Sequence, residues 1–172
     1  MNLFNTSNFE RQGNTENDIH LDNIDDIRKS VNQLATTALR TIKIFTPDLE
    51  HETYNNDIFQ KALMNLIRGN RHAQIQILVS DSSAAIHHGH RLISLARQLT
   101  SAMQIRNTPE DYQYTHMTFI LVDQSGFVFK PDGAVQNAIV SNCKYRSNKL
   151  QEFFTPAWEQ AEQDPQVREV QI

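Results

Sequence analysis

The sequence predicts a single α/β domain in which a mixed β-sheet is flanked by helices. Short apolar segments with strand periodicity alternate with longer segments of helical periodicity from residue 18 onward. A hairpin pattern around Asp123-Gln124-Ser125-Gly126 adds antiparallel strands to this β-α-β order. The length of 172 residues, 39% of them hydrophobic, fits one compact domain better than two.

The predicted strands are rich in β-branched or alternating apolar residues and end at turn signals. They cover residues 19–21, 41–46, 74–79, 103–106, 117–122 and 127–129.

The predicted helices repeat apolar residues every three or four positions. Asn23 caps the first helix, which runs to about residue 39, and Asp57 caps the second, which Gly69-Asn70 closes. The third and fourth helices span about 88–100 and 147–163. Pro156 is expected to kink the last helix or to start a new turn.

The first 17 residues are polar and lack any periodicity, which predicts a disordered tail over 1–17 before a single domain over 18–172. This start has no continuous apolar stretch, and no run elsewhere approaches the ~20 apolar residues of a membrane helix. One cysteine, Cys143, cannot form an intramolecular disulfide, which fits a reducing compartment. We therefore expect a cytoplasmic protein with no membrane partner.

The net charge of -4 argues against bulk electrostatic binding to nucleic acid, so a nucleic-acid partner is not expected. The segment His87-His88-Gly89-His90 invites a metal hypothesis, but adjacent histidines point in different directions and no cysteine or second histidine pair completes a tetrahedron. We expect neither a metal nor a cofactor. The same segment could begin a helix whose free N–H groups meet an anion, with His90 and Arg91 as ligand-binding residues beside Ser82 and Ser83. Lys130 is the third candidate ligand-binding residue.

One segment carries the strongest functional signal. His116, Thr118 and Asp123 fall on the His, Lys and Asp positions of the pattern His-x-Lys-x-x-x-x-Asp, and residues 116 and 118 share one face of a predicted strand. The segment resembles the signature of the phospholipase D superfamily, with threonine in place of lysine. The resemblance implies a phospholipase D-like fold and makes His116 and Asp123 the candidate catalytic residues.

In active members of that superfamily a histidine attacks phosphorus, a lysine stabilises the phosphoryl oxygens, and the histidine of a second motif protonates the leaving group. Thr118 carries no positive charge, and losing a donor at a developing oxyanion costs ~10²–10³ in rate. The superfamily's Gly-Ser-x-Asn element is also replaced, by Gly126-Phe127-Val128-Phe129. The resemblance therefore favours a non-catalytic binding or interaction module, with a residual anion pocket for a phosphate-containing ligand.

Two alternatives stay open at this point. The first is a phosphodiesterase or nuclease that uses His116, with Lys130 or Arg91 replacing the missing lysine. The second is a protein-interaction scaffold without a small-molecule site.

The chain also resembles a bacterial domain that is similar to one half of a phospholipase D. That domain has no assigned activity. The matching segments are Ile44-Phe45-Thr46-Pro47-Asp48-Leu49 and Gly89-His90-Arg91-Leu92-Ile93-Ser94-Leu95-Ala96-Arg97. That domain is sometimes joined to acetyltransferases, which implies an acetyltransferase partner. Superfamily sites are built from two motif-bearing halves, and this chain offers one, so a homodimer is expected to pair the two His116 residues near its axis.

Overall fold

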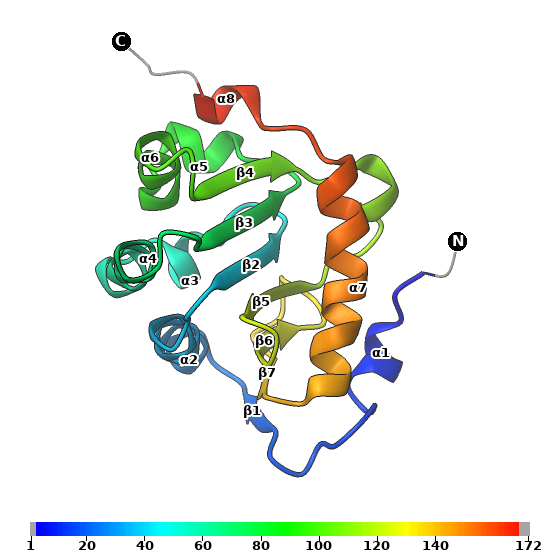
Figure 1. The fold of residues 1–172 in the computed structure, drawn as a ribbon. Helices are drawn as coiled ribbons and strands as arrows, with labels where there is room; N and C mark the ends of the chain where they lie inside the picture. The colour runs from blue at the N-terminus through cyan, green and yellow to red at the C-terminus, as the bar shows by residue number, and fades with distance from the viewer. Residues whose placement is uncertain (1–2, 169–172) are drawn as a thin grey trace.

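The computed structural model describes residues 3–168, which form one seven-stranded mixed β-sheet with helices on both faces (Figure 1). The strand order across the sheet is β1-β7-β6-β5-β2-β3-β4. Strands β2, β3 and β4 are parallel, whereas β5, β6, β7 and β1 each run antiparallel to their neighbours. The bounds are β1 Ile19–Leu21, β2 Thr41–Thr46, β3 Gln74–Val79, β4 Met103–Asn107, β5 Thr118–Val122, β6 Gly126–Lys130 and β7 Ala138–Ser141. The predicted mixed sheet flanked by helices is confirmed.

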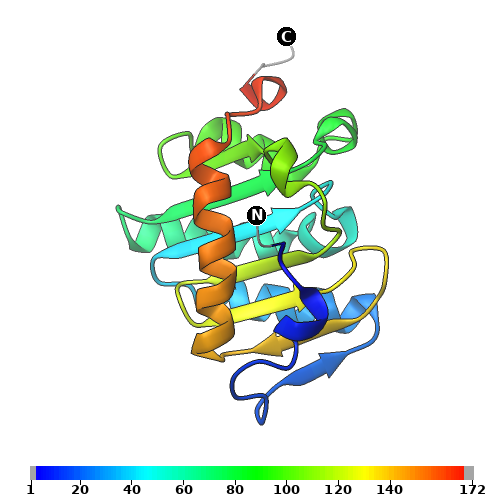
Figure 2. The same ribbon diagram turned by 90° about the vertical axis from the view of Figure 1, so that its right-hand side faces the viewer.

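Two helical layers cover the sheet. Helices α2, α4 and α6 lie on one face, and the long α7 crosses the other face with α1 beside it (Figures 1 and 2). The bounds are α1 Thr6–Phe9, α2 Ile24–Thr36, α3 His51–Tyr54, α4 Asp57–Gly69, α5 Ser83–His87, α6 Arg91–Gln98, α7 Lys144–Gln160 and α8 Pro165–Arg168, with a 3-10 turn at Glu110–Tyr112. Within residues 3–168, no helix is long and apolar enough to cross a membrane.

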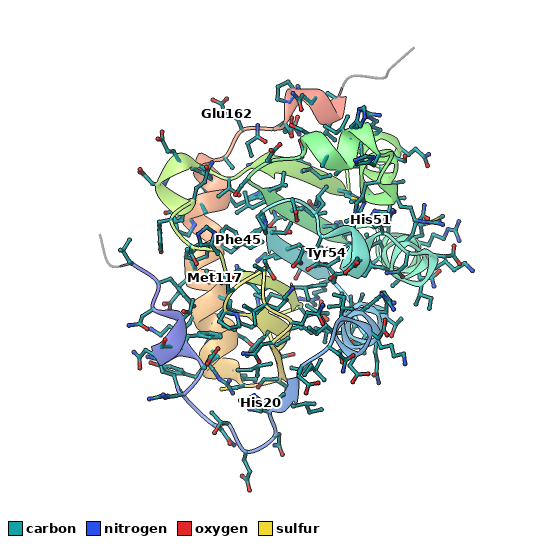
Figure 3. All side chains as sticks on the ribbon, turned by 180° about the vertical axis from the view of Figure 1, so that it is seen from behind. His20, Phe45, His51, Tyr54, Met117 and Glu162 are labelled. Atoms are coloured by element: carbon teal, nitrogen blue, oxygen red, sulfur yellow. The ribbon has the colours of Figure 1, made fainter. Side chains whose placement is uncertain are left out.

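The two faces of the sheet bury different kinds of side chain. Because successive strand residues point to opposite faces, Ile44 joins a mainly aliphatic cluster under α2, α4 and α6, while Phe45 joins a cluster rich in phenylalanine, here called the aromatic cluster, under α7. Figure 3 shows this division: Tyr54 lies on the side of α4, and Phe45 and Met117 lie toward α7. The loops at the ends of the strands therefore extend from a sheet that is packed on both sides.

Three expected helix boundaries need correction. Asn56, not Asp57, caps α4, because its side chain accepts a hydrogen bond from the Phe59 N–H. The helix expected over 88–100 is shorter, at Arg91–Gln98, because Gly89 has a φ of +71° that a helix cannot contain and that separates α6 from the preceding α5. The last helix begins at residue 144 and ends at 160, and it keeps Pro156 inside it.

The N-terminal segment also differs from the expectation. Residues 1–2 lie outside the described residues, but residues 3–17, expected to belong to a disordered tail, contain α1 and pack onto the domain. Phe9 is buried in the aromatic cluster, and Phe4 packs against it. The polar composition of this segment predicted disorder, but these two aromatic side chains, five residues apart, supply enough apolar contact to hold it on the domain.

Candidate functional site

An open cleft of about 470 Å³ lies at the carboxyl end of β2. Four segments line it: the start of α2, the loop and helix that follow β2, the single residue His116 before β5, and the end of β6 with the loop that follows it. Their lining residues are Ile24, Pro47, Asp48, Glu50, His51, Glu52, Thr53, His116, Lys130, Asp132, Gly133, Ala134 and Gln136. Ligands of open α/β sheets bind outside the carboxyl ends of parallel strands, so the cleft has the position of a binding site.

A buried ion pair forms the floor of the cleft. The Lys130 Nζ donates to Glu50 Oε1 at 3.1 Å and to the Gly133 carbonyl at 3.3 Å. The two side chains are only 7% and 11% exposed. Burial raises the pKa of Glu50, and the Lys130 ammonium opposes that rise. Removing one partner of such a pair leaves the other charge buried without compensation, which typically costs about 3–5 kcal/mol.

A strained turn directs Glu50 into the cleft. Leu49 and Glu50 have φ values of +68° and +28°, in the region that non-glycine residues rarely adopt. Such residues cost on the order of 1–3 kcal/mol each and persist only where surrounding contacts hold them. Here the Leu49 side chain is fully buried, its carbonyl accepts from His90 Nε2 at 3.0 Å, and the Glu50 N–H donates to Asp48 Oδ1 at 3.0 Å.

The missing lysine of the motif has a cross-strand counterpart. Thr118 and Lys130 are directly paired in the β5–β6 ladder, and paired residues present their side chains to the same face. The Thr118 hydroxyl lies 3.5 Å from Glu50 Oε1, so threonine, glutamate and lysine meet at one point. A Cβ on Gly133 would lie 3.1 Å from Thr118 Cγ2, so the loop after β6 closes over residue 118 and leaves little room for a longer side chain.

His116 is exposed at the cleft, and its carbonyl accepts a hydrogen bond from the Gly133 N–H at 2.8 Å. A second histidine, His51 at the start of α3, lines the same cleft (Figure 3). Its Nδ1 lies 3.0 Å from the Asn55 side-chain amide. His116, Lys130, Glu50 and His51 therefore line one cleft, and Thr118 contacts Glu50 at its floor.

Asp123, the other catalytic candidate, lies at the opposite end of β5. Its carboxylate accepts hydrogen bonds from the N–H groups of Leu39, Arg40 and Thr41, at 2.8–3.1 Å for the shortest bond to each. Asp123 itself has a φ of +55° in the hairpin turn. The structure thus gives this carboxylate a role in holding the start of β2 and does not bring it to His116.

The predicted ligand-binding residues His90 and Arg91 lie apart from Lys130. His90 is buried and caps α6: its Nδ1 accepts from the Leu92 N–H at 3.1 Å, so Nε2 carries the proton given to Leu49. His90 borders a neighbouring hollow together with His51, but both of its ring nitrogens are already used. The Arg91 guanidinium donates to Gln60 at 3.0 Å on the surface of α4. Ser82 hydrogen-bonds the Asp164 carboxylate, so it is also engaged.

The charge of the cleft is predominantly negative. Four carboxylates line it, from Asp48, Glu50, Glu52 and Asp132, and among residues 3–168 Lys130 is the one lysine or arginine that does so. Over the same residues, no group of three or more histidine, cysteine or acidic side chains is arranged to hold a metal ion. The cleft therefore offers hydrogen-bonding and titratable groups, with little free positive charge.

Sequence reasoning missed Glu50 and His51, although both follow a predicted strand that ends at Pro47-Asp48. Polar residues directly after a parallel strand lie at the edge of the sheet where ligands bind, which is the signal that could have found them.

Several solved structures share this fold. TrmBL2, an archaeal chromatin protein described as showing a novel mode of DNA binding, aligns with a TM-score of 0.63 and 15% identity over 90% of this chain, which spans 56% of that protein's length. Nuc from Salmonella typhimurium, a phospholipase D family member, aligns with a TM-score of 0.54 and 15% identity over 80% of this chain and 90% of Nuc. NucT from Helicobacter pylori gives 0.57 and 9% over 86% of this chain and 98% of NucT. At identities this low the TM-scores show the fold alone, and that fold is phospholipase D-like.

No curated protein matches the sequence. The model of the family described as domain of unknown function DUF7931 matches residues 23–170, and the chain therefore belongs to that family.

Proposed function

We propose that this chain is a phospholipase D-like binding module that does not hydrolyse phosphodiesters by the mechanism of that superfamily. The observation that carries the proposal is the buried pair between Lys130 and Glu50. Among the described residues that line the cleft, Lys130 is the one lysine or arginine, and this pair holds it against a carboxylate. Phosphoryl transfer needs a cation that is free to stabilise the phosphoryl oxygens.

The other charges of the cleft also disfavour phosphate binding. A phosphoryl group entering the cleft would approach Asp48, Glu52 and Asp132 as well as Glu50. Like charges in a partly desolvated site repel one another, so a phosphate-containing ligand is expected to bind weakly while Glu50 is ionised. Protonation of Glu50, whose pKa is raised by burial, would free Lys130 for an anion.

A binding role is compatible with the fold. TrmBL2 is described as a chromatin protein that binds DNA, whereas Nuc is described as a phospholipase D family member, so the same fold serves more than one kind of protein. For this chain we propose a cleft that binds a small ligand and has lost the catalytic lysine.

The first test is a metal-independent assay with a generic phosphodiester such as bis(p-nitrophenyl) phosphate. We expect the purified protein and its His116→Ala variant to give the same rate, equal to that of buffer. A rate in the unmodified protein that His116→Ala abolishes would overturn the proposal.

The second test asks whether Glu50 closes an anion pocket. NMR titration with inorganic phosphate at pH 7.5 should show weak binding to the unmodified protein and binding about tenfold tighter to Glu50→Gln. Removing a like charge about 6 Å away at an effective dielectric near 40 is worth about 1.4 kcal/mol, or tenfold. Glu52→Gln is the matched control, because Glu52 lines the cleft without contacting Lys130, and it should change the affinity less. Shifts spread over the surface, or none with any variant, would favour a protein-interaction scaffold.

A phosphodiesterase is the second candidate function, and one observation favours it. Lys130 lies across the ladder from Thr118, and the cleft that it lines also contains two histidines, His51 and His116. Such an enzyme would use one histidine as nucleophile and the other as general acid. Under this alternative, hydrolysis would be lost in His116→Ala and sharply reduced in His51→Gln and Lys130→Met.

A further inference from the structure

The ion pair at the floor of the cleft does not use all of its hydrogen-bonding groups. A lysine ammonium has three N–H donors, and within residues 3–168 that of Lys130 has two acceptors, Glu50 Oε1 and the Gly133 carbonyl. Glu50 Oε1 accepts from Lys130 and lies 3.5 Å from the Thr118 hydroxyl, whereas Glu50 Oε2 accepts no hydrogen bond from these residues. The pair therefore keeps one unused donor and one unused acceptor.

Both unused groups belong to side chains that line the cleft. The Lys130 side chain is 7% exposed and that of Glu50 is 11% exposed, so each retains only a small contact with solvent. Glu50 Oε2 is not among the polar atoms that are sealed from solvent without a partner, so it faces open space. Because unpaired polar groups on nearly buried side chains are costly, a ligand that fills both positions is favoured.

A carboxamide has the matching pair of groups. Its carbonyl oxygen can accept from the Lys130 ammonium while its neighbouring N–H donates to Glu50 Oε2. A carboxylate in the same place offers no donor and puts a second negative charge against Glu50. An amidinium offers no acceptor and puts a second positive charge against Lys130. Either charged group therefore replaces one attractive contact with a repulsive one.

The walls of the cleft also suit an uncharged ligand. Ile24, Pro47 and Ala134 give it apolar surface, on which a small ring or chain can pack. The cleft continues at His51 into the neighbouring hollow of about 370 Å³, which Ala84 lines. Ligand sites commonly combine such apolar walls with a few convergent polar groups.

The other three carboxylates of the cleft add little attraction for a cation. Asp48, Glu52 and Asp132 are all exposed, so water and salt screen their charges. The nearly buried pair between Lys130 and Glu50 therefore decides which ligand group is accepted.

We propose that the ligand of this cleft is an uncharged carboxamide on a small ring or apolar group, with its carbonyl on Lys130 and its N–H on Glu50. This inference rests on the proposed function, because it names the ligand class of the same binding module. The ion pair that withholds Lys130 from a phosphate is then the element that recognises the amide.

The first experiment compares three probes of almost identical shape: benzamide, benzoate and benzamidine. At pH 7.5 they are neutral, anionic and cationic. In NMR titrations of the unmodified protein, benzamide should shift the amides of residues 48–52, 116–118 and 130–134. It should bind about fivefold more tightly than either of the other two, since each of those lacks one hydrogen bond worth roughly 1 kcal/mol.

The second experiment reverses the preference. In Glu50→Gln, the glutamine carbonyl can accept from Lys130 and its NH₂ group then replaces Oε2 as a donor toward the cleft. Benzoate should therefore bind more tightly than benzamide to this variant. Glu52→Gln removes a charge from the same cleft without touching the ion pair, so benzamide should remain the tightest of the three probes. Thermal unfolding shows whether each variant is folded.

Three results would overturn the inference. The first is benzoate or benzamidine binding to the unmodified protein as tightly as benzamide. The second is a benzamide titration whose shifts are absent or lie outside the cleft. The third is an order of affinity that Glu50→Gln leaves unchanged although the variant is folded.

Failure of the proposed function has a different readout. Hydrolysis of bis(p-nitrophenyl) phosphate that is lost in His116→Ala would overturn the binding module itself, whatever the order of the three probes. A protein that does not hydrolyse this phosphodiester and binds benzoate best at the cleft would retain the proposed function and overturn the carboxamide ligand.

Discussion

His90 is a residue whose charge state is set by its place in the fold. Burial lowers the pKa of His90 from 6.5 to about 4, against the opposing effect of its bond to the Leu49 carbonyl. Because this folded-state pKa lies below the unfolded value, neutral His90 stabilises the fold above pH 6.5, and that contribution is lost as the pH falls toward 4. Between pH 7.5 and pH 5 the loss from this residue is about 2 kcal/mol.

Urea unfolding of the unmodified protein and of His90→Asn at both pH values provides the test. Asparagine can still cap α6 but does not titrate. The variant should be less stable at pH 7.5, and its stability should fall by about 2 kcal/mol less on going to pH 5. An identical pH dependence in the two proteins would contradict the assignment.

Asp123 matches the aspartate of the motif, yet its contacts predict a structural effect. Asp123→Ala removes the acceptor of three backbone N–H groups and places alanine at a φ of +55°. We expect a loss of about 2–4 kcal/mol in unfolding free energy, because bonds to a charged acceptor and left-handed strain both contribute. Asp123→Asn keeps an acceptor and tolerates this conformation, so it should lose clearly less. Unchanged stability with altered phosphate binding at the cleft would show a functional role instead.

At the scale of elements, the break between α5 and α6 rests on one glycine. Gly89 has a φ of +71°, and a Cβ added there would meet nothing within 4 Å. Gly89→Ala should therefore destabilise the protein by about 1–2 kcal/mol through backbone strain alone. Gly69→Ala is the matched control: it also meets open space but has no positive φ and lies at the end of α4, so it should be neutral or stabilising. Thermal unfolding of both variants gives the comparison, and equal effects would contradict the strain argument.

The cleft lies at one edge of the sheet, where β2 and β6 end and β5 begins. The sequence identified His116 from the motif and Lys130 as a ligand-binding residue, and both line the cleft. It did not show that Lys130 pairs with Thr118 across the ladder, because strand register depends on tertiary contacts. Nor did it indicate Glu50, whose direction is set by a strained turn that the buried Leu49 side chain and hydrogen bonds with His90 and Asp48 hold in place.

At the scale of the whole molecule, the homodimer stays a prediction, and so does the acetyltransferase partner. The exposed position of His116 at the cleft is compatible with pairing across a two-fold axis. Light scattering at micromolar concentration should give twice the chain mass of 19.8 kDa. In a Cys143→Ser background, His116→Cys should then form an intermolecular disulfide, whereas Lys61→Cys on the outer surface of α4 should not. A monomer, or a dimer that only the second variant links, would contradict the predicted interface.

The sequence by itself determined the layered α/β architecture and most strand and helix positions, because hydrophobic periodicity records which face of each element is buried. It also located His116 through a local motif. The tertiary structure alone decided that Lys130 opposes Glu50, that Asp123 holds the start of β2, and that residues 4–9 cover the aromatic face. These features depend on side chains far apart in the chain, whose burial and partners exist only once the sheet has brought them together.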